Sequence, residues 1–188
     1  MGHSKQSKEQ HHAQIVAIAA KRFKENGLEG LSISQLMQEA GLTHGGFYKH
    51  FASREDLVVQ AVECALSASR AKLSDPTLSY PAFVQTYLSP THRDAVGDGC
   101  ALAALASDVA RAQAATKRLY TEQLTHTLAR LQHLLGDEDN SQAIVAFSAL
   151  TGALAMARAV DDEQLALQIL EVARTYTLQT SDKHLDPL

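Results

Sequence analysis

The sequence predicts an all-α protein, and three observations lead to this fold class. Only four Pro and ten Gly interrupt the 188 residues, whereas Ala and Leu, two strong helix formers, recur throughout. Apolar residues follow the 3.6-residue period of amphipathic helices, and no segment shows the alternation of a half-buried strand. The chain is 45% hydrophobic, which is ordinary for a globular protein that buries a sizeable core.

The first two helices have clear start and stop signals. The first is expected over about residues 9–26, where apolar residues share one face and Gly27 can take the left-handed position that ends a helix. The second begins after Ser32, because Ser32 and Gln35 form a capping-box pattern. It stops at Gly41.

A third short helix completes an N-terminal head. Thr43 is its candidate N-cap, and it is expected to run to about Phe51. A helix, a tight turn containing glycine and a second helix over about residues 32–51 predict a helix-turn-helix unit. We therefore expect a helix-turn-helix domain over residues 1–57 and a larger helical body over residues 58–188.

The body should consist of helices alone. Arg54 opens a long helix with acidic residues in its first turn, where the helix dipole favours them. Residues 89–99, rich in Pro and Gly, are expected to be the least regular part. Body helices are expected over about residues 54–73, 80–88, 100–112, 115–135, 141–160 and 163–179, followed by a polar tail that ends at Leu188.

The charge is distributed unevenly, although the net charge is only −4. Residues 1–54 hold seven Lys or Arg against four acidic residues, a balance of +3, and the rest of the chain has a balance of −7. A basic head on an acidic body is expected when one part of a protein meets a polyanion.

The remaining composition bounds the compartment and the cofactors. Two cysteines, Cys64 and Cys100, are too few for a disulfide framework or a four-thiolate zinc site. No apolar run approaches the roughly 20 residues that span a bilayer, and the N-terminus lacks the apolar core of a signal peptide. We expect a cytoplasmic protein with no cofactor, no bound metal and no membrane partner.

The third helix carries the most informative side chains. On an α-helix, Phe47 and Phe51 share the inward face, and His44 and Tyr48 lie on another side. The two glycines at its start, which include Gly45, let the backbone approach another surface closely. Free N–H groups at such a start suit phosphate oxygens. This arrangement favours a recognition helix for the major groove of DNA.

One pattern in this region has a fixed spacing without gaps. It consists of Phe23, Gly27, Leu28, Gly30, Leu31, Ser32 and Ile33, then Gly41-Leu42-Thr43-His44-Gly45-Gly46-Phe47-Tyr48-Lys49-His50-Phe51 and Ser53-Arg54-Glu55-Asp56-Leu57. The pattern resembles the signature of the TetR family of bacterial transcriptional regulators over about residues 10–60. The resemblance implies a homodimer that binds a pseudo-palindromic operator in double-stranded DNA, and a body whose unknown small-molecule effector releases the two heads.

The resemblance also implies which residues contact DNA. The matching positions are Thr43, His44, Gly45, Tyr48, Lys49 and His50, with frequent phosphate contacts at Ser32, Ser34, Gln35 and Arg54. From their chemistry we expect Tyr48, Thr43 and Arg54 to hold phosphates and His44 and Lys49 to reach base edges. The sequence departs from the family pattern at His44, where Lys is common, at Gly46, where a hydroxyl or methyl is common, and at Met37, where a small residue is usual.

The body is expected to supply a dimer surface and a ligand cavity. The last two helices are apolar over a wider arc than one buried face needs, which favours a four-helix interface between two subunits over one thick monomeric core. Cys100 at a helix N-terminus is either an inert thiol or a redox or electrophile sensor. Candidates for the cavity, with core packing as the alternative for each, are Phe83, Tyr87, Cys100, Leu124, Phe147 and Leu150.

Two other classes of function were weighed. An enzyme could use Cys100 with His126 and His133, but seven residues span about 10.5 Å of helix, too far for one metal, and no familiar catalytic motif occurs. A helical adaptor could use the head as a protein-docking surface. We expect no enzymatic activity and a DNA-binding regulator, a repressor by the habit of the family.

Overall fold

The computed structural model describes residues 2–136 and 138–182, and it contains helices and no strand in this part of the chain. The all-α prediction is confirmed. The elements in chain order are α1 (Gly2–Asn26), α2 (Ile33–Glu39), the 3₁₀ helix η1 (His44–Lys49), α3 (Arg54–Leu73), α4 (Tyr80–Tyr87), α5 (Pro90–Asp94), the 3₁₀ helix η2 (Val96–Asp98), α6 (Ala101–Arg111), α7 (Ala114–Leu135), α8 (Ser141–Ala159) and α9 (Glu163–Asp182).

Most element boundaries agree with the sequence, and three do not. Helix α1 begins at Gly2 rather than near residue 9. Residues 89–99 are more regular than expected, because Ser89 caps α5 and η2 follows directly. The third element is not an α-helix. The polar tail expected after residue 182 lies outside the described residues.

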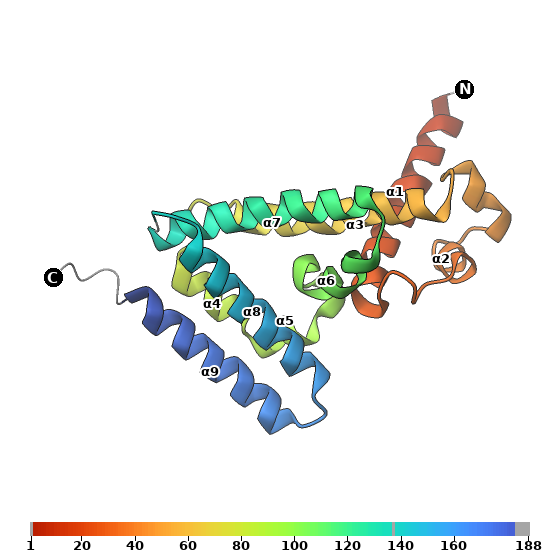
Figure 1. The fold of residues 1–188 in the computed structure, drawn as a ribbon. Helices are drawn as coiled ribbons and strands as arrows, with labels where there is room; N and C mark the ends of the chain where they lie inside the picture. The colour runs from red at the N-terminus through yellow and green to blue at the C-terminus, as the bar shows by residue number, and fades with distance from the viewer. Residues whose placement is uncertain (1, 137, 183–188) are drawn as a thin grey trace.

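The head consists of α1, α2, η1 and the first part of α3 (Figure 1). Ser32 caps α2 with the reciprocal bonds of a capping box: its hydroxyl accepts from the Gln35 N–H at 3.2 Å, and its own N–H donates to Gln35 Oε1 at 3.2 Å. Gly27 and Gly41 have φ angles of 76° and 71°, so glycine is needed where the chain leaves α1 and α2.

The segment predicted as a third α-helix is a 3₁₀ helix instead. Its bonds join residues three apart, Gly46 N to Thr43 O and His50 N to Phe47 O, both at 2.9 Å. Thr43 stands at the N-cap, but its side chain makes no capping bond. Two adjacent glycines disfavour an α-helix, and a segment of six residues suits the tighter helix.

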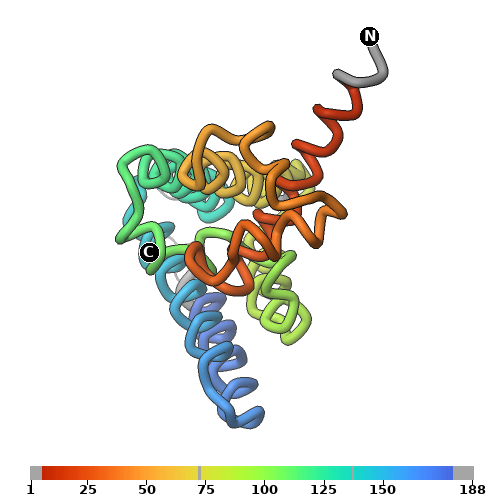
Figure 2. Tube along the Cα trace, turned by 90° about the vertical axis from the view of Figure 1, so that its right-hand side faces the viewer, coloured from red at the N-terminus to blue at the C-terminus, as the bar shows by residue number. Residues whose placement is uncertain are grey.

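The body is built around α3 and α7, which lie side by side (Figure 1). Helix α6 contacts α1, α3, α7 and α8, so it links the head to the rest. Helices α8 and α9 pack together at the edge of the body, far from the N-terminal end of α1 (Figures 1 and 2). The expected boundary at residue 57 falls within α3 and stays a prediction.

One side of the α8–α9 pair is apolar and uncovered. The exposed large apolar side chains of this pair are Ile144, Val145, Met156, Leu165, Leu167, Val172 and Tyr176. By helical spacing, Val145 and Met156 share one face of α8, and Leu165, Val172 and Tyr176 share one face of α9. Helix α8 is also the one helix among the described residues that is long and apolar enough to cross a membrane, with 19 residues and a mean hydropathy of 1.3. The expectation that no apolar run approaches the length of a membrane span is therefore wrong. Helix α8 is apolar at the positions that face the core and also at exposed positions.

Two glycines of the head differ in the room around them, which gives a matched stability test. A Cβ at Gly30 would lie 2.0 Å from the Asn26 carbonyl oxygen, whereas a Cβ at Gly45 would meet nothing within 4 Å. Gly30→Ala should lower the free energy of unfolding by about 1–3 kcal/mol, because backbone must move. Gly45→Ala should leave it unchanged or slightly raised. Thermal unfolding followed by circular dichroism measures both, and equal melting temperatures would contradict this packing.

Candidate nucleic-acid interface and ligand cavity

The exposed surface of η1 is held from beneath by two phenylalanines. Phe47 and Phe51 are buried and stack at 5.2 Å between ring centroids. Tyr48 is 69% exposed, and its ring meets Phe47 edge to face at 5.2 Å. Tyr48 therefore projects from a fixed base.

Four further residues of this turn are exposed as the sequence predicts. Thr43, His44, Gly45 and Lys49 all face solvent. The open space above Gly45 leaves its backbone accessible to a large partner. With Tyr48, these residues form one continuous polar and basic surface, which we call the recognition surface (residues 43–45, 48 and 49).

His50 is less exposed than these residues, and a DNA contact at this position stays a prediction. Its Nδ1 is buried and has no hydrogen-bond partner, and its ring centroid lies 6.1 Å from that of His12 in α1. His12 in turn stacks on Phe51 at 4.7 Å and makes a 2.8 Å hydrogen bond with Gln60. His12 is thus part of the ordered helix α1 and packs against the head.

The pKa of His50 is lowered, and its position explains why. Burial is the largest cause, followed by the positive charges of His12, Lys8, His11 and Lys49. A ring that loses water and faces other cations resists protonation. The neutral form of His50 is therefore the one that packs against α1.

The predicted phosphate contacts outside η1 are mostly engaged within the protein. Arg54 donates to the Leu28 carbonyl at 2.5 Å and to Glu29 Oε1 at 3.1 Å, so it secures the connector after α1. The side chains of Ser32 and Gln35 bond to each other. Ser34 is exposed. A DNA contact at any of these four positions stays a prediction.

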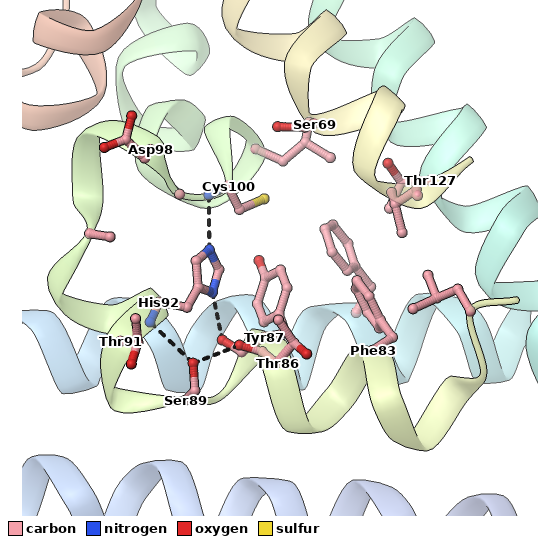
Figure 3. Close-up of a pocket in the computed structure, with 16 residues that line it drawn as sticks. Ser69, Phe83, Thr86, Tyr87, Ser89, Thr91, His92, Asp98, Cys100 and Thr127 are labelled. Carbon is pink, nitrogen blue, oxygen red and sulfur yellow. Dashed lines mark hydrogen bonds between the residues drawn. The ribbon is translucent and has the colours of Figure 1, made fainter. Parts of the chain in front are cut away.

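A cavity of about 360 Å³ lies in the body between α3, α4, α6, α7 and α8 (Figure 3). Phe83, Tyr87, Cys100 and Phe147 line it as predicted, but Leu124 and Leu150 do not. Leu150 is fully buried in the core, and Leu124 is half-buried on α7. The periodicity of a helix identifies its apolar positions but not which of them border a void.

The sequence missed His92, which organises one end of this cavity. The Cys100 N–H donates to His92 Nε2 at 3.1 Å, so the ring carries its proton on Nδ1, which donates to the Tyr87 carbonyl at 2.6 Å. Ser89 accepts from the His92 N–H (Figure 3). His92 thus joins the end of α4 to the start of α6.

The same end of the cavity touches the head. Asp98 pairs with Lys21 of α1 at 3.2 Å, and Lys24 donates to the Gly99 carbonyl at 3.4 Å. A Cβ at Gly97 would lie 2.2 Å from Glu25 Oε1 and 2.8 Å from Lys21 Cγ, so η2 packs closely on the side chains of α1. One segment, residues 92–100, therefore borders both the cavity and α1.

The histidines weighed for an enzyme lie apart from these features. His126 and His133 are both exposed on α7. In the described ranges, no group of three or more His, Cys, Asp or Glu is arranged to hold a metal ion.

Comparison with known proteins identifies the N-terminal segment. Residues 15–61 match the family model described as bacterial regulatory proteins, tetR family. A curated relative, the uncharacterized HTH-type transcriptional regulator YfiR of Bacillus subtilis (strain 168), is 30% identical over 70 residues. That match covers 37% of this chain and 34% of the relative, about a third of its length.

Solved structures match over nearly the whole chain. A TetR transcriptional regulator from Chloroflexus aurantiacus J-10-FL has a TM-score of 0.77 at 19% identity, over 93% of this chain and 97% of that one. The reduced form of E. coli NemR has a TM-score of 0.73 at 19% identity, over 89% and 95% of the two chains. Identities this low show a common fold, and function must be argued from the site.

The head and its exposed turn define a helix-turn-helix protein with a helical body. Residues 15–61 match the tetR family of bacterial regulatory proteins, and the chain as a whole shares the fold of solved TetR transcriptional regulators.

The partial burial of His50 predicts how the stability of the fold depends on pH. Because its pKa is lowered in the folded state, the unfolded chain binds more protons below the ordinary pKa of about 6.5, and stability must rise with pH there. His50→Asn should reduce the fall in melting temperature between pH 7.5 and 5.5. His126→Asn, which removes an exposed histidine of α7, is the control and should keep the fall seen in the parent protein. An unchanged slope in His50→Asn would contradict the assignment.

Proposed function

We propose that the protein is a DNA-binding transcriptional regulator whose recognition surface enters the major groove of a specific operator. The observation that carries this proposal is the exposure of Tyr48 on a turn that Phe47 and Phe51 fix from below. Tyr48 beside Lys49 and His44 presents hydroxyl, ammonium and imidazole groups, which are the groups that contact phosphates and base edges. The partner that suits a basic head is DNA, and the protein acts in the bacterial cytoplasm, where that DNA lies.

The residues of the recognition surface make different kinds of DNA contact, according to their chemistry. Tyr48 and Thr43 hydroxyls bind phosphates and set the register of the head on the duplex. Lys49 and His44 reach base edges and supply sequence preference. The open backbone at Gly45 admits the close approach that such contacts need. Arg54 supports this arrangement by holding the connector at Leu28.

The protein acts as a homodimer through the α8–α9 face. Val145, Gly152 and Met156 line one exposed side of α8, and a Cβ at Gly152 would meet nothing within 4 Å. Val172 and Tyr176 extend this apolar surface along α9. Burying it against a second copy forms a four-helix interface. Two heads related by this symmetry read a pseudo-palindromic site whose half-sites are about one turn of duplex apart.

Binding of a small-molecule effector in the cavity releases the protein from its operator, so the protein acts as a repressor. Support comes from residues 92–100, which border the cavity and also contact α1 through Asp98 and Gly97. An effector that prefers a different arrangement of this segment shifts the position of the head.

Removing one recognition side chain should weaken DNA binding without unfolding the protein. The operator is first obtained by selecting bound duplexes from a random pool, and a palindromic consensus is expected. Tyr48→Ala and Lys49→Ala should each weaken binding by about 1–3 kcal/mol, or five- to 150-fold. Lys117→Ala removes the same charge from α7 and should stay within twofold. Affinity should also fall steeply between 50 and 200 mM salt, and salt-independent binding would favour the adaptor alternative.

A charge placed in the α8–α9 face should separate the subunits. Val172 is 59% exposed in the single chain, and Val172→Glu would bury an unpaired carboxylate in the dimer. Light scattering after gel filtration should then show a monomer, and operator binding should be lost with it. Ala129→Glu, at an exposed position on α7, should remain dimeric. A dimer in both variants would place the interface elsewhere.

A further inference from the structure

We infer that the cavity takes an uncharged, mostly aromatic molecule carrying one hydrogen-bond acceptor, such as a ketone oxygen, and that the Tyr87 hydroxyl donates to this acceptor. The inference rests on the proposed effector role of the cavity and adds the chemistry of the ligand.

The hydroxyl of Tyr87 is the starting point. The residue is 6% exposed, and its Oη is buried without a hydrogen-bond partner. Buried polar groups nearly always have a partner, so an orphan needs an explanation. In Figure 3 the hydroxyl points toward Cys100 across the cavity, and a thiol is only a weak hydrogen-bonding group. A ligand atom in the cavity is the partner that this hydroxyl lacks.

The proton of this hydroxyl stays in place at any physiological pH. Burial raises the pKa of Tyr87 well above its ordinary value of 10, and the Cys100 thiol adds to the shift. The phenol is therefore neutral and offers an O–H to the cavity, which a ligand meets best with an acceptor oxygen.

Three other polar side chains of the wall already have partners. The Ser69 hydroxyl donates to the Ala65 carbonyl at 3.3 Å. The Thr127 hydroxyl accepts from Gln123 at 3.2 Å. Both ring nitrogens of His92 are engaged, at 2.6 and 3.1 Å. The hydrogen-bonding demand on a ligand thus centres on Tyr87.

The charges around the cavity argue against an ionic ligand. Among the described residues, the lining contains no Lys or Arg, and its one carboxylate, Asp98, pairs with Lys21 at the surface. His92 is neutral because its Nε2 accepts from a backbone N–H. A carboxylate ligand would lose its hydration without a charged partner in the lining, because the nearby Arg158 guanidinium lies behind the wall and is bonded to two backbone carbonyls.

One cation behind the wall favours an electronegative atom at this end. Arg158 donates to the carbonyls of Arg93 and His92 at 2.9 Å each, so its charge is fixed near Tyr87 without entering the lining. Its field lowers the pKa of Tyr87, against the larger effect of burial. A ketone oxygen bound to Tyr87 gains from this field, whereas a cationic ligand would be repelled.

The remaining surface sets size and shape. Phe83 and Phe147 lie on either side of Tyr87, with ring centroids 5.4 and 6.0 Å from its own, and leucines complete the wall. Aromatic walls favour flat aromatic ligands. A volume of about 360 Å³ lies at the lower end of small-molecule sites and suits a bicyclic ring.

Three probes of one shape test the inference on the full-length protein without DNA. They are 2-acetylnaphthalene, which has a ketone, 2-naphthoate, which has a carboxylate, and 2-ethylnaphthalene, which has no oxygen. Their affinities are measured by displacement of the fluorescent probe N-phenyl-1-naphthylamine. We expect the ketone to bind about three- to tenfold tighter than the hydrocarbon, as one net hydrogen bond implies, and at least tenfold tighter than the carboxylate.

Tyr87→Phe should remove the preference for the ketone and leave the affinity of 2-ethylnaphthalene within twofold. It removes a buried orphan hydroxyl, so its melting temperature should not fall. Tyr120→Phe is the matched control, because the Tyr120 hydroxyl donates to the Leu102 carbonyl at 2.9 Å and does not line the cavity. It should keep the preference.

Three results would overturn the inference: a carboxylate that binds as tightly as the ketone, a ketone preference that survives in Tyr87→Phe, or displacement by none of the probes. If one of these results is obtained and the protein still selects a palindromic duplex, the ligand inference fails and the proposed regulatory function is retained. If the probes bind in the expected order but the protein does not bind duplex DNA, the ligand chemistry is supported and the proposed function as a DNA-binding regulator is rejected.

Discussion

Burial of Phe47 and Phe51 is the constraint on which the head depends. A six-residue turn that contains two adjacent glycines has little helical preference of its own. Its shape comes from the two rings packed beneath it and from the His12 ring that stacks on Phe51. The long helix α1 is therefore part of the recognition unit, because it supplies one side of the pocket into which the turn is anchored.

The fold could be predicted because the residues that start and end its helices act locally. Ser32, Ser53 and Ser79 cap helices with their own hydroxyls, and Gly27, Gly41 and Gly136 end helices in the left-handed conformation. Each signal acts within four residues, so it can be read without tertiary structure. The type of helix at residues 44–49 could not, since α and 3₁₀ geometry differ by little energy in so short a segment.

The features of the candidate site were likewise predictable only where they depend on local sequence. Exposure of Tyr48 follows from the spacing of Phe47 and Phe51, but the inward turn of His50 depends on His12, 38 positions earlier in the chain. Two departures from the family pattern also meet only in three dimensions. The Met37 side chain reaches beneath Gly46, with its Cε 3.5 Å from where a Cβ would be. The two departures thus adjoin each other, and a methyl group at position 46 would make ordinary van der Waals contact with Met37.

Residues 92–100 show how a cavity in the body can act on the head without a long pathway. The backbone of Tyr87 is tied to the backbone of Cys100 by one imidazole, and Gly97, a few residues before Cys100, lies against α1 with no room for a methyl group. The atoms that crowd Gly97 belong to the Glu25 and Lys21 side chains, so η2 packs on side chains of α1. A ligand that moves the end of α4 would act through His92 on Cys100 and so on the segment that contacts α1 through Gly97 and Asp98. The proposed coupling would thus run through His92, Gly97 and Asp98, whose contacts join residues far apart in the sequence and form no sequence motif.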